Sequence, residues 1–384
     1  MRSDSLGFDL TDEQRLIALS VRDFAQARLA PGAAARDRDG TFPLEFIPEL
    51  AGLGLLAMKV PVEEGGAGAD NVSYALAMQA VATACASTTV ILASSNLASK
   101  ILSDYGTAAQ KERWLVPYAA GRLGPASFAL SEPGAGSDAA ALRATAILDG
   151  NHYVLDGSKM WITSGAHAGF HIVFAKSDPA AGSRGIDCFV VERGTPGLTV
   201  GKEEEKMGQR ASGTVALYFD RCRIPRENRI GPERGGYGIA LSALGGGRVG
   251  IAALCLGIGE AALEEGRRYV HERAVFGKPL ADFQNTQFVF ADCRMDLDAA
   301  WLLMLRAARV LDKKERGASE SSMAKLFASE ALGRVVDRMV QVHGGYGYSK
   351  EYAVERHYRD ARVTRIYEGT SEIQRLVIAR DVLG

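Results

Sequence analysis

The sequence predicts an α+β protein of three consecutive domains: an amino-terminal helical domain, a middle antiparallel β domain and a carboxy-terminal bundle of four to five helices. The apolar residues recur with a helical period up to about residue 120, with the two-residue period of strands from Gly124, and with a helical period again from about Gly235. A chain of 384 residues is also too long for one ordinary core. We expect the domains to span residues 1–123, 124–230 and 231–384.

The amino-terminal domain is expected to begin with a helix after Thr11, because Thr11, Asp12 and Glu13 form a typical helix start. Turns are indicated at Pro43 and across residues 60–70, which read VPVEEGGAGAD. Residues 73–102 are almost entirely apolar or small. They predict one or two long buried helices.

The middle domain is indicated by two Asp-Gly pairs, Asp149-Gly150 and Asp156-Gly157, between short alternating runs. Such pairs between strands are the strongest local hairpin pattern, so we expect a turn at each. Further strands are predicted at residues 170–177, 186–192 and 214–225.

The carboxy-terminal bundle is predicted from long segments with apolar residues three and four positions apart, at 264–277, 283–315 and 321–345. Residues 238–263 are apolar enough to suggest a membrane span. Arg248 and Glu260 interrupt this stretch and leave an uncharged run too short to cross a bilayer. We therefore expect a buried helix and no membrane partner.

The overall composition excludes several classes of protein. The 45 basic and 46 acidic residues nearly balance, without a basic run, so nucleic acid is not an expected partner. The five cysteines are far apart, without a CxxC pair, and indicate buried thiols in a reducing compartment. The first residues, MRSDSLGFDLTDEQRLIAL, match neither a secretory signal nor a transit peptide. A cytoplasmic location follows.

Three short motifs do not support the chemistry that they suggest. Residues 133–139, PGAGSDA, match a loose dinucleotide-binding pattern but lead into hairpins where that pattern requires a strand, a turn and a helix. His167 and His171 have ligand-like spacing without a cysteine or carboxylate cluster, so no metal site is predicted. Ser322 and Lys325 form an S-x-x-K motif without its companions. We interpret it as a helix whose inward residues are Met323, Leu326 and Phe327.

Five segments together resemble the acyl-CoA dehydrogenase family in sequence and in order: FALSEPGAGSD, MWITSG, RAVFGKPLADFQ, QVHGGYGY and YEGTSEIQR. The resemblance extends over essentially the whole chain. It implies FAD as cofactor, an acyl-CoA substrate, an electron-transfer flavoprotein as partner, and a homo-oligomer built as a dimer of dimers.

The resemblance also implies the residues that contact FAD. Most would come from the same chain, whereas the segment from Gln341 to Gly345 would serve a neighbouring subunit. The implied FAD contacts are Phe128, Leu130, Ser131, Gly136, Ser137, Trp161, Ile162, Thr163, Arg273, Phe276, Gln284, Gln341, Gly344, Gly345, Thr370 and Glu372. The implied substrate contacts are Ser137, Arg248 and Gly369.

By the same resemblance, Glu368 is the general base that removes the proton α to the thioester carbonyl while a hydride leaves the β-carbon for flavin N5. Such a base needs an apolar environment that raises its basicity and donors that stabilise the enolate. Some relatives carry the base just before the arginine that is Arg248 here, but this chain has Gly247 there. Gly245 stands where many relatives have an acid that contacts the acyl-CoA.

The Gly245-Gly246-Gly247 run leaves room near the expected place of the acyl chain, although a close helix crossing explains it equally well. A similar Gly-Gly-Arg occurs in branched short-chain members of the family, and this resemblance favours isobutyryl-type or short-to-medium substrates. Three alternatives remain: an acyl-CoA oxidase, a flavin monooxygenase, or a dehydrogenase acting on an acyl group bound to a carrier protein. Glu368 argues against a monooxygenase. A non-catalytic binding protein is disfavoured because neither the base nor the flavin contacts are lost.

Overall fold

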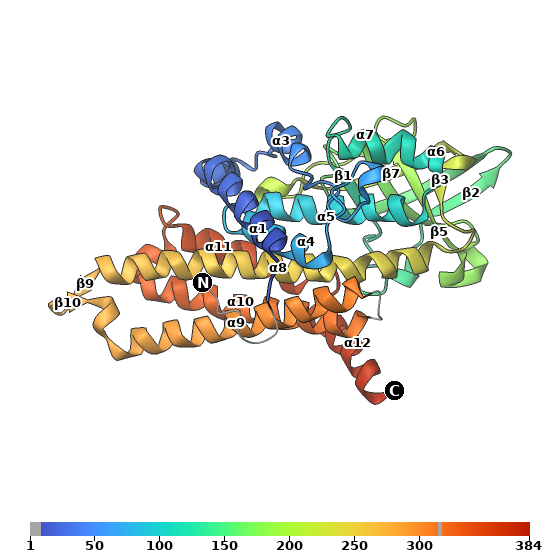
Figure 1. The fold of residues 1–384 in the computed structure, drawn as a ribbon. Helices are drawn as coiled ribbons and strands as arrows, with labels where there is room; N and C mark the ends of the chain where they lie inside the picture. The colour runs from blue at the N-terminus through green and yellow to red at the C-terminus, as the bar shows by residue number, and fades with distance from the viewer. Residues whose placement is uncertain (1–8, 314–316) are drawn as a thin grey trace.

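The computed structural model describes residues 9–313 and 317–384, and its elements follow the predicted order of helices, sheet and helices (Figure 1). Residues 1–8, at the predicted amino-terminal start, and residues 314–315, at the end of a predicted helical segment, lie outside the described residues. The long helix α8 (Gly236–Glu272) runs along the molecule. Helices α9, α10 and α12 lie on one side of it, and the amino-terminal helices, the sheet and α11 lie on the other.

The amino-terminal part is helical, as predicted. Thr11 caps the first helix, because its Oγ1 accepts a hydrogen bond from Gln14 N at 3.2 Å and its own N–H donates to Gln14 Oε1 at 3.0 Å. The apolar segment from residue 73 forms two helices, with a break after Ala82. The helices are α1 (Asp12–Phe24), α2 (Ala33–Asp39), α3 (Ile47–Gly52), α4 (Asn71–Ala82), α5 (Ala86–Tyr105), α6 (Ala108–Gln110) and α7 (Val116–Ala119).

The middle part is one eight-stranded sheet, in the order β6-β7-β3-β2-β4-β5-β8, with β1 beside β4. Most pairs are antiparallel, but β4 pairs in parallel with β1 and β2. The strands are β1 (Ala126–Ala129), β2 (Thr145–Asp149), β3 (His152–Thr163), β4 (Phe170–Lys176), β5 (Ile186–Glu192), β6 (Leu198–Val200), β7 (Thr214–Pro225) and β8 (Arg229–Ile230).

One of the two predicted Asp-Gly turns is present. Asp149-Gly150 turns the β2–β3 hairpin, with Gly150 at a φ of 61°. The turn predicted at Asp156-Gly157 is wrong, because both residues lie inside β3 at a register shift against β7. Gly157 has a φ of 127°, and a Cβ there would lie 2.9 Å from Ala144 Cα. Glycine here serves a β-bulge.

The carboxy-terminal part contains five helices in the described residues, as predicted: α8, α9 (Gln284–Asp312), α10 (Ala318–His343), α11 (Ala353–Arg362) and α12 (Ser371–Leu383). A short hairpin, β9 (Ala274–Val275) with β10 (Lys278–Pro279), follows α8. Of the described helices, α8 alone is long and apolar enough to cross a membrane, yet 67% of its most apolar window is buried within the protein. It packs against α4, α5 and α10, as expected of a core helix.

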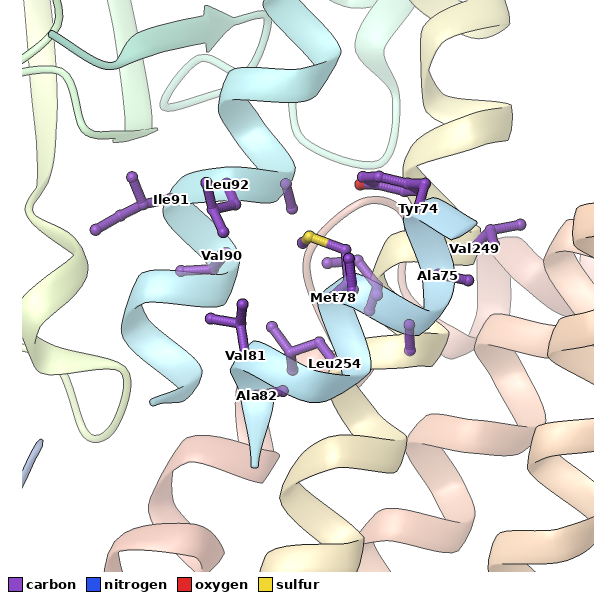
Figure 2. Packing of buried hydrophobic residues seen from close by; sticks show 14 of the residues in the cluster. Tyr74, Ala75, Met78, Val81, Ala82, Val90, Ile91, Leu92, Val249 and Leu254 are labelled. Carbon is purple, nitrogen blue, oxygen red and sulfur yellow. The ribbon is translucent and has the colours of Figure 1, made fainter. Parts of the chain in front are cut away.

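The core between α4, α5 and α8 is filled by the side chains drawn in Figure 2. Tyr74 and Met78 of α4 belong to the same buried cluster as Val249 and Leu254 of α8. The two helices approach closely at Gly257, where an added Cβ would lie 2.4 Å from Gln79 O. A missing side chain on α8 therefore permits this crossing.

We predict that Gly257→Ala destabilises the protein by about 1–3 kcal/mol, because the methyl group must push α4 away from α8. Gly238→Ala is the matched control, since it lies on the same helix with no atom within 4 Å of an added Cβ. That control is expected to stabilise the protein by about 0.5–1 kcal/mol through helix propensity. Melting temperatures measure both changes, and equal shifts would contradict the close crossing.

Candidate active site

Glu368 lies in a tight turn just before α12, and its backbone adopts the left-handed conformation with a φ of 52°. The next residue, Gly369, has a φ of 93°. Gln374 holds the turn, because its Nε2 donates to Glu368 O at 3.1 Å and to Gly369 O at 2.9 Å. Lys325 Nζ also donates to Gly369 O, at 2.7 Å. These bonds offset the cost of left-handed backbone at a glutamate.

The Glu368 carboxylate points at α8. A Cβ on Gly247 would lie 2.4 Å from Glu368 Oε2, so only glycine leaves space for this oxygen. Oε2 is inaccessible to solvent and has no hydrogen-bond partner among the described residues. Burial raises the pKa of Glu368 to about 7, against the opposing effects of Lys325, Arg248 and Lys59. A carboxylate in this state is a poised base without a protein partner.

Two of these cations were not predicted as site residues. Lys325 is buried on α10 with Ser322 and Ala324, whereas Met323, Leu326 and Phe327 are only half-buried. The inward face predicted from the S-x-x-K segment is confirmed only for Phe327, which packs against the core. Lys325, which was not predicted to point inward, is buried because it binds a backbone carbonyl. The motif itself was the one available pointer to Lys325, and no pattern pointed to Lys59.

Arg248, a predicted substrate contact, lies one residue from Gly247 on α8. Its Nη1 donates to Ser322 Oγ at 3.1 Å, and its Nε has no partner among the described residues. Burial lowers the pKa of Arg248, and the nearby Glu368 opposes this by raising it. Arg248 and Glu368 thus belong to one site. Among the described backbone hydrogen bonds, the Glu368 N–H donates to no carbonyl, which leaves it available to a ligand.

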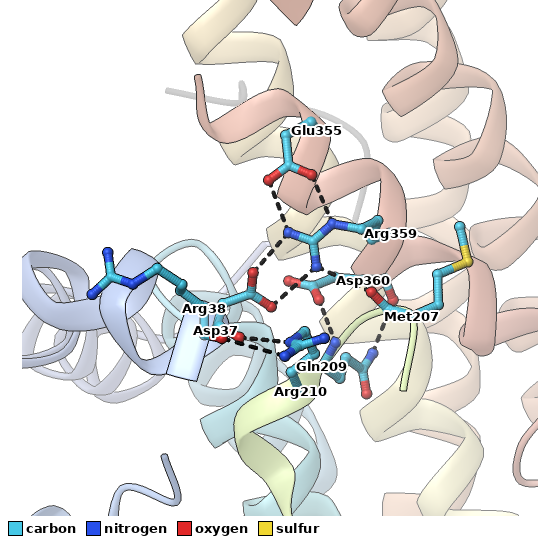
Figure 3. A network of polar contacts seen from close by, with 8 residues as sticks. All are labelled: Asp37, Arg38, Met207, Gln209, Arg210, Glu355, Arg359 and Asp360. Atoms are coloured by element: carbon cyan, nitrogen blue, oxygen red, sulfur yellow. Dashed lines mark hydrogen bonds and ion pairs between the residues drawn. The ribbon is translucent and has the colours of Figure 1, made fainter. Parts of the chain in front are cut away.

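The turn before Glu368 is connected to all three parts of the chain by the polar network in Figure 3. Gln209 Nε2, from the loop before β7, donates to Tyr367 Oη at 3.2 Å and to Asp360 O at 3.1 Å. Arg359 of α11 pairs with Asp37 of α2 at 2.7 Å. Burial raises the pKa of Asp360 to about 6, while its hydrogen bond from Gln209 N opposes that rise.

The predicted flavin-contacting segments of the sheet lie together. Met160 N donates to Ser131 O at 2.9 Å, which joins the loop after β1 to β3. Trp161 has a φ of 64° and is 60% exposed, beside the buried Ile162 and half-buried Thr163. The remaining residues of this group are Phe128, half-buried, Leu130, buried, and Gly136 and Ser137, exposed.

This surface fits a flavin. It offers an exposed aromatic ring at Trp161, hydroxyl groups at Ser131 and Thr163, and open backbone at Gly136, where an added Cβ would meet no atom within 4 Å. A planar aromatic cofactor needs these apolar and hydrogen-bonding surfaces in one place. Thr370, the N-cap of α12, and Glu372, exposed in its first turn, follow directly after Glu368 and Gly369.

The other predicted cofactor residues lie at the opposite end of α8. Arg273, Gln341, Gly344 and Gly345 line one open groove of about 560 Å³. Phe276, in the β9–β10 hairpin, is 96% exposed, and Gln284 is exposed at the start of α9. From Gly247 to Arg273 the helix rises about 40 Å. One chain therefore does not bring this group to Glu368, as the position of the hairpin in Figure 1 shows.

The two histidines considered for a metal have other partners. His171 Nδ1 lies 2.7 Å from Ser127 Oγ, and His167 Nε2 lies 3.1 Å from Glu203 Oε1. In the part of the chain that the structure describes, no three His, Cys, Asp or Glu residues gather as a metal site would require. The five cysteines are buried and unpaired.

Comparison with known proteins gives consistent matches along the chain. Sequence models of the acyl-CoA dehydrogenase N-terminal, middle and C-terminal domains match residues 11–122, 127–222 and 234–383. The mitochondrial short-chain specific acyl-CoA dehydrogenase of Mus musculus is 46% identical over 98% of this chain and 91% of its own length.

Two solved structures share the fold over 98% of this chain and 99% of their own. Butyryl-CoA dehydrogenase from Megasphaera elsdenii matches with a TM-score of 0.95 and 41% identity. A chain from a structure described as the electron transferring flavoprotein of Acidaminococcus fermentans matches with a TM-score of 0.96 and 38% identity.

Proposed function

This chain belongs to the acyl-CoA dehydrogenase family, and from that premise we propose that it oxidises the α,β carbon–carbon bond of a short-chain acyl-CoA with Glu368 as the base. The observation that carries the proposal is the Glu368 carboxylate, whose Oε2 is buried without a partner and whose pKa is raised to about 7. The product is the trans-2-enoyl-CoA. The relatives named for short-chain and butyryl substrates support the chain length.

The residues around Glu368 can perform the proton transfer. Glu368 Oε2 takes the α-proton, and the free Glu368 N–H donates to the thioester oxygen, where negative charge develops. Lys325 and Arg248 place positive charge beside the same carboxylate. FAD, the cofactor of this family, accepts the hydride from the β-carbon when it is bound. The surface around Trp161 would hold its ring.

The space available to the acyl group is narrower than the glycine run suggested. A Cβ added to Gly246 would lie only 2.8 Å from Lys59 Nζ, and a Cβ added to Gly247 would collide with the Glu368 carboxylate. Gly245 alone of the three adjoins open space. This arrangement supports a short acyl chain and gives no room for a branch at Gly246 or Gly247.

A second copy of the chain completes the cofactor site in this proposal. Arg273 lines the same groove as Gln341, Gly344 and Gly345, so we assign it, too, to a neighbouring subunit's FAD. The separation of about 40 Å along α8 excludes one small cofactor reaching both groups within a chain. A symmetric dimer, paired into a tetramer, satisfies this requirement.

Electrons leave through a separate electron-transfer flavoprotein in this proposal. The five cysteines are buried and form no disulfide, which supports an external electron acceptor in this proposal. A reducing, cytoplasmic location agrees with these unpaired thiols.

We predict that Glu368→Gln lowers the rate of flavin reduction by a factor on the order of 10³, because the amide cannot accept the α-proton. FAD content and acyl-CoA binding are expected to persist, since neither depends on the charge of Glu368. Anaerobic stopped-flow mixing with butyryl-CoA measures the rate. Glu264→Gln, a surface acid paired with Arg267, is the matched control. Bleaching of the Glu368 variant within tenfold of the wild-type rate would exclude Glu368 as the base.

We predict that kcat/KM for butyryl-CoA increases with pH through a midpoint near 7. Only the carboxylate form of Glu368 accepts a proton, and burial raises its pKa to about 7, so activity is lost as pH falls below that value. The profile is measured with an electron-transfer flavoprotein as acceptor, and with oxygen for comparison. A midpoint near the ordinary glutamate value of about 4.5 would contradict a desolvated base.

We predict that Arg273→Glu and Glu368→Gln subunits, each inactive alone, regain activity when co-expressed. If Arg273 serves the neighbouring site, a mixed dimer contains one site without either change. Random pairing then restores about a quarter of the wild-type activity. No recovery in a mixed dimer verified by mass spectrometry would show that Arg273 and Glu368 serve the same chain's site.

A further inference from the structure

Lys59 is a half-buried cation for which the proposed reaction has no use. Its neighbours Met58 and Val60 are buried, and Met58 N donates to Asn96 Oδ1 of α5 at 2.9 Å, which fixes the backbone here. The Lys59 Nζ lies 4.6 Å from the centre of the Tyr74 ring. A Cβ on Gly246 would lie 2.8 Å from the same nitrogen. The ammonium group is thus enclosed between α4 and α8.

No carboxylate pairs with this ammonium group among the residues that the structure describes. Asp104 is paired with Lys100, and Asp312 accepts from Asn71 N at 2.7 Å. The third acid that raises the pKa of Lys59, besides Asp104 and Asp312, is Glu368. Burial lowers the pKa of Lys59 to about 8, which leaves it mostly charged at neutral pH. A half-buried cation without a paired carboxylate is unfavourable, so the protein retains it at a cost.

Lys59 and Glu368 lie along one face of α8. Gly250 is four residues from Gly246 and three from Gly247, so it lies next to both of these adjacent positions, one turn along the helix. Added Cβ atoms there would meet Lys59 Nζ, Glu368 Oε2 and Tyr74 Oη, the last at 2.4 Å. Leu97 of α5 adds an apolar wall, 3.1 Å from the Gly247 position. Helices α4, α5 and α8 therefore enclose a strip that begins at the base and carries a cation further along.

An acyl chain with its α-carbon at Glu368 has two directions to follow. The thioester leads outward to CoA. An acyl group that continues inward along this strip passes Gly246, and its far end then lies at Lys59. A methyl end would leave the ammonium group without a counterion, whereas a carboxylate would supply one.

We propose that Lys59 binds a carboxylate at the far end of the acyl group, so that the preferred substrate is the CoA monothioester of a short dicarboxylic acid. This inference rests on the proposed function and names the substrate class of that same site. The carboxylate exchanges hydration for a charge-assisted hydrogen bond in an enclosed site. The Tyr74 ring, on the other side of the ammonium group, limits how far the lysine can move.

The test compares substrates that differ only in their far end. Flavin bleaching in the holoenzyme is measured anaerobically with succinyl-CoA against butyryl-CoA, glutaryl-CoA against pentanoyl-CoA, and adipyl-CoA against hexanoyl-CoA. We expect wild-type kcat/KM to favour the dicarboxylic member of at least one pair. Lys59→Met is expected to reduce that ratio on the order of 10²-fold, because the carboxylate loses its partner in a desolvated site. Lys59→Arg should retain most of the preference.

Lys111→Met is the matched control, since Lys111 is also a half-buried lysine but pairs with Glu64, and it should leave the ratio unchanged. A wild-type preference for the monocarboxylic member of every pair would overturn the inference while leaving the proposed function intact. So would an equal loss with both members in Lys59→Met, which would mean that Lys59 acts on Glu368. If no acyl-CoA bleaches the flavin, the proposed function itself fails. The comparison of substrates in the wild-type enzyme tests the inference even if the Lys59→Met variant does not fold.

Discussion

The arrangement of the site depends on one constraint, the left-handed backbone conformation of Glu368, which directs its carboxylate toward α8. A glutamate adopts such a backbone only when its surroundings hold it there. Gln374 and Lys325 do so by binding the carbonyls of residues 368 and 369. The same lysine then adds positive charge beside the carboxylate. Lys325 thus both fixes the turn and lowers the pKa of the Glu368 carboxyl, against the larger effect of burial.

The turn at Glu368 is itself held in place by contacts between parts of the chain that are distant in sequence. Gln209 bonds both Asp360 and Tyr367, and Arg359 pairs with Asp37 of the first helical part. The loop fits closely against α11, since a Cβ on Gly208 would lie 2.3 Å from Arg359 O. Correct docking of the helical and β parts is therefore a condition for placing the base, as Figure 3 shows.

Periodicity predicted the order of helices and strands because burial on one face leaves a regular apolar pattern. It failed at Asp156-Gly157, where the same dipeptide that turns a hairpin serves a bulge, and only strand pairing distinguishes the two. Glu368 was predicted by resemblance, but its conformation and raised pKa depend on residues far away in sequence. The burial of Lys325 was not predicted, because a polar residue that points inward leaves no apolar pattern. Lys59 lies in a loop that has no period at all.

The glycines of α8 show how one property of the sequence serves both the fold and the site. Gly257 lets α4 approach through its backbone, and Gly250 admits the Tyr74 hydroxyl. One turn earlier, Gly246 and Gly247 admit Lys59 and Glu368. Side chains at these positions would fill the volume that opposite charges now occupy. A run of small residues that looks like a plain helix crossing is therefore also what brings a cation and a carboxylate close to the same helix.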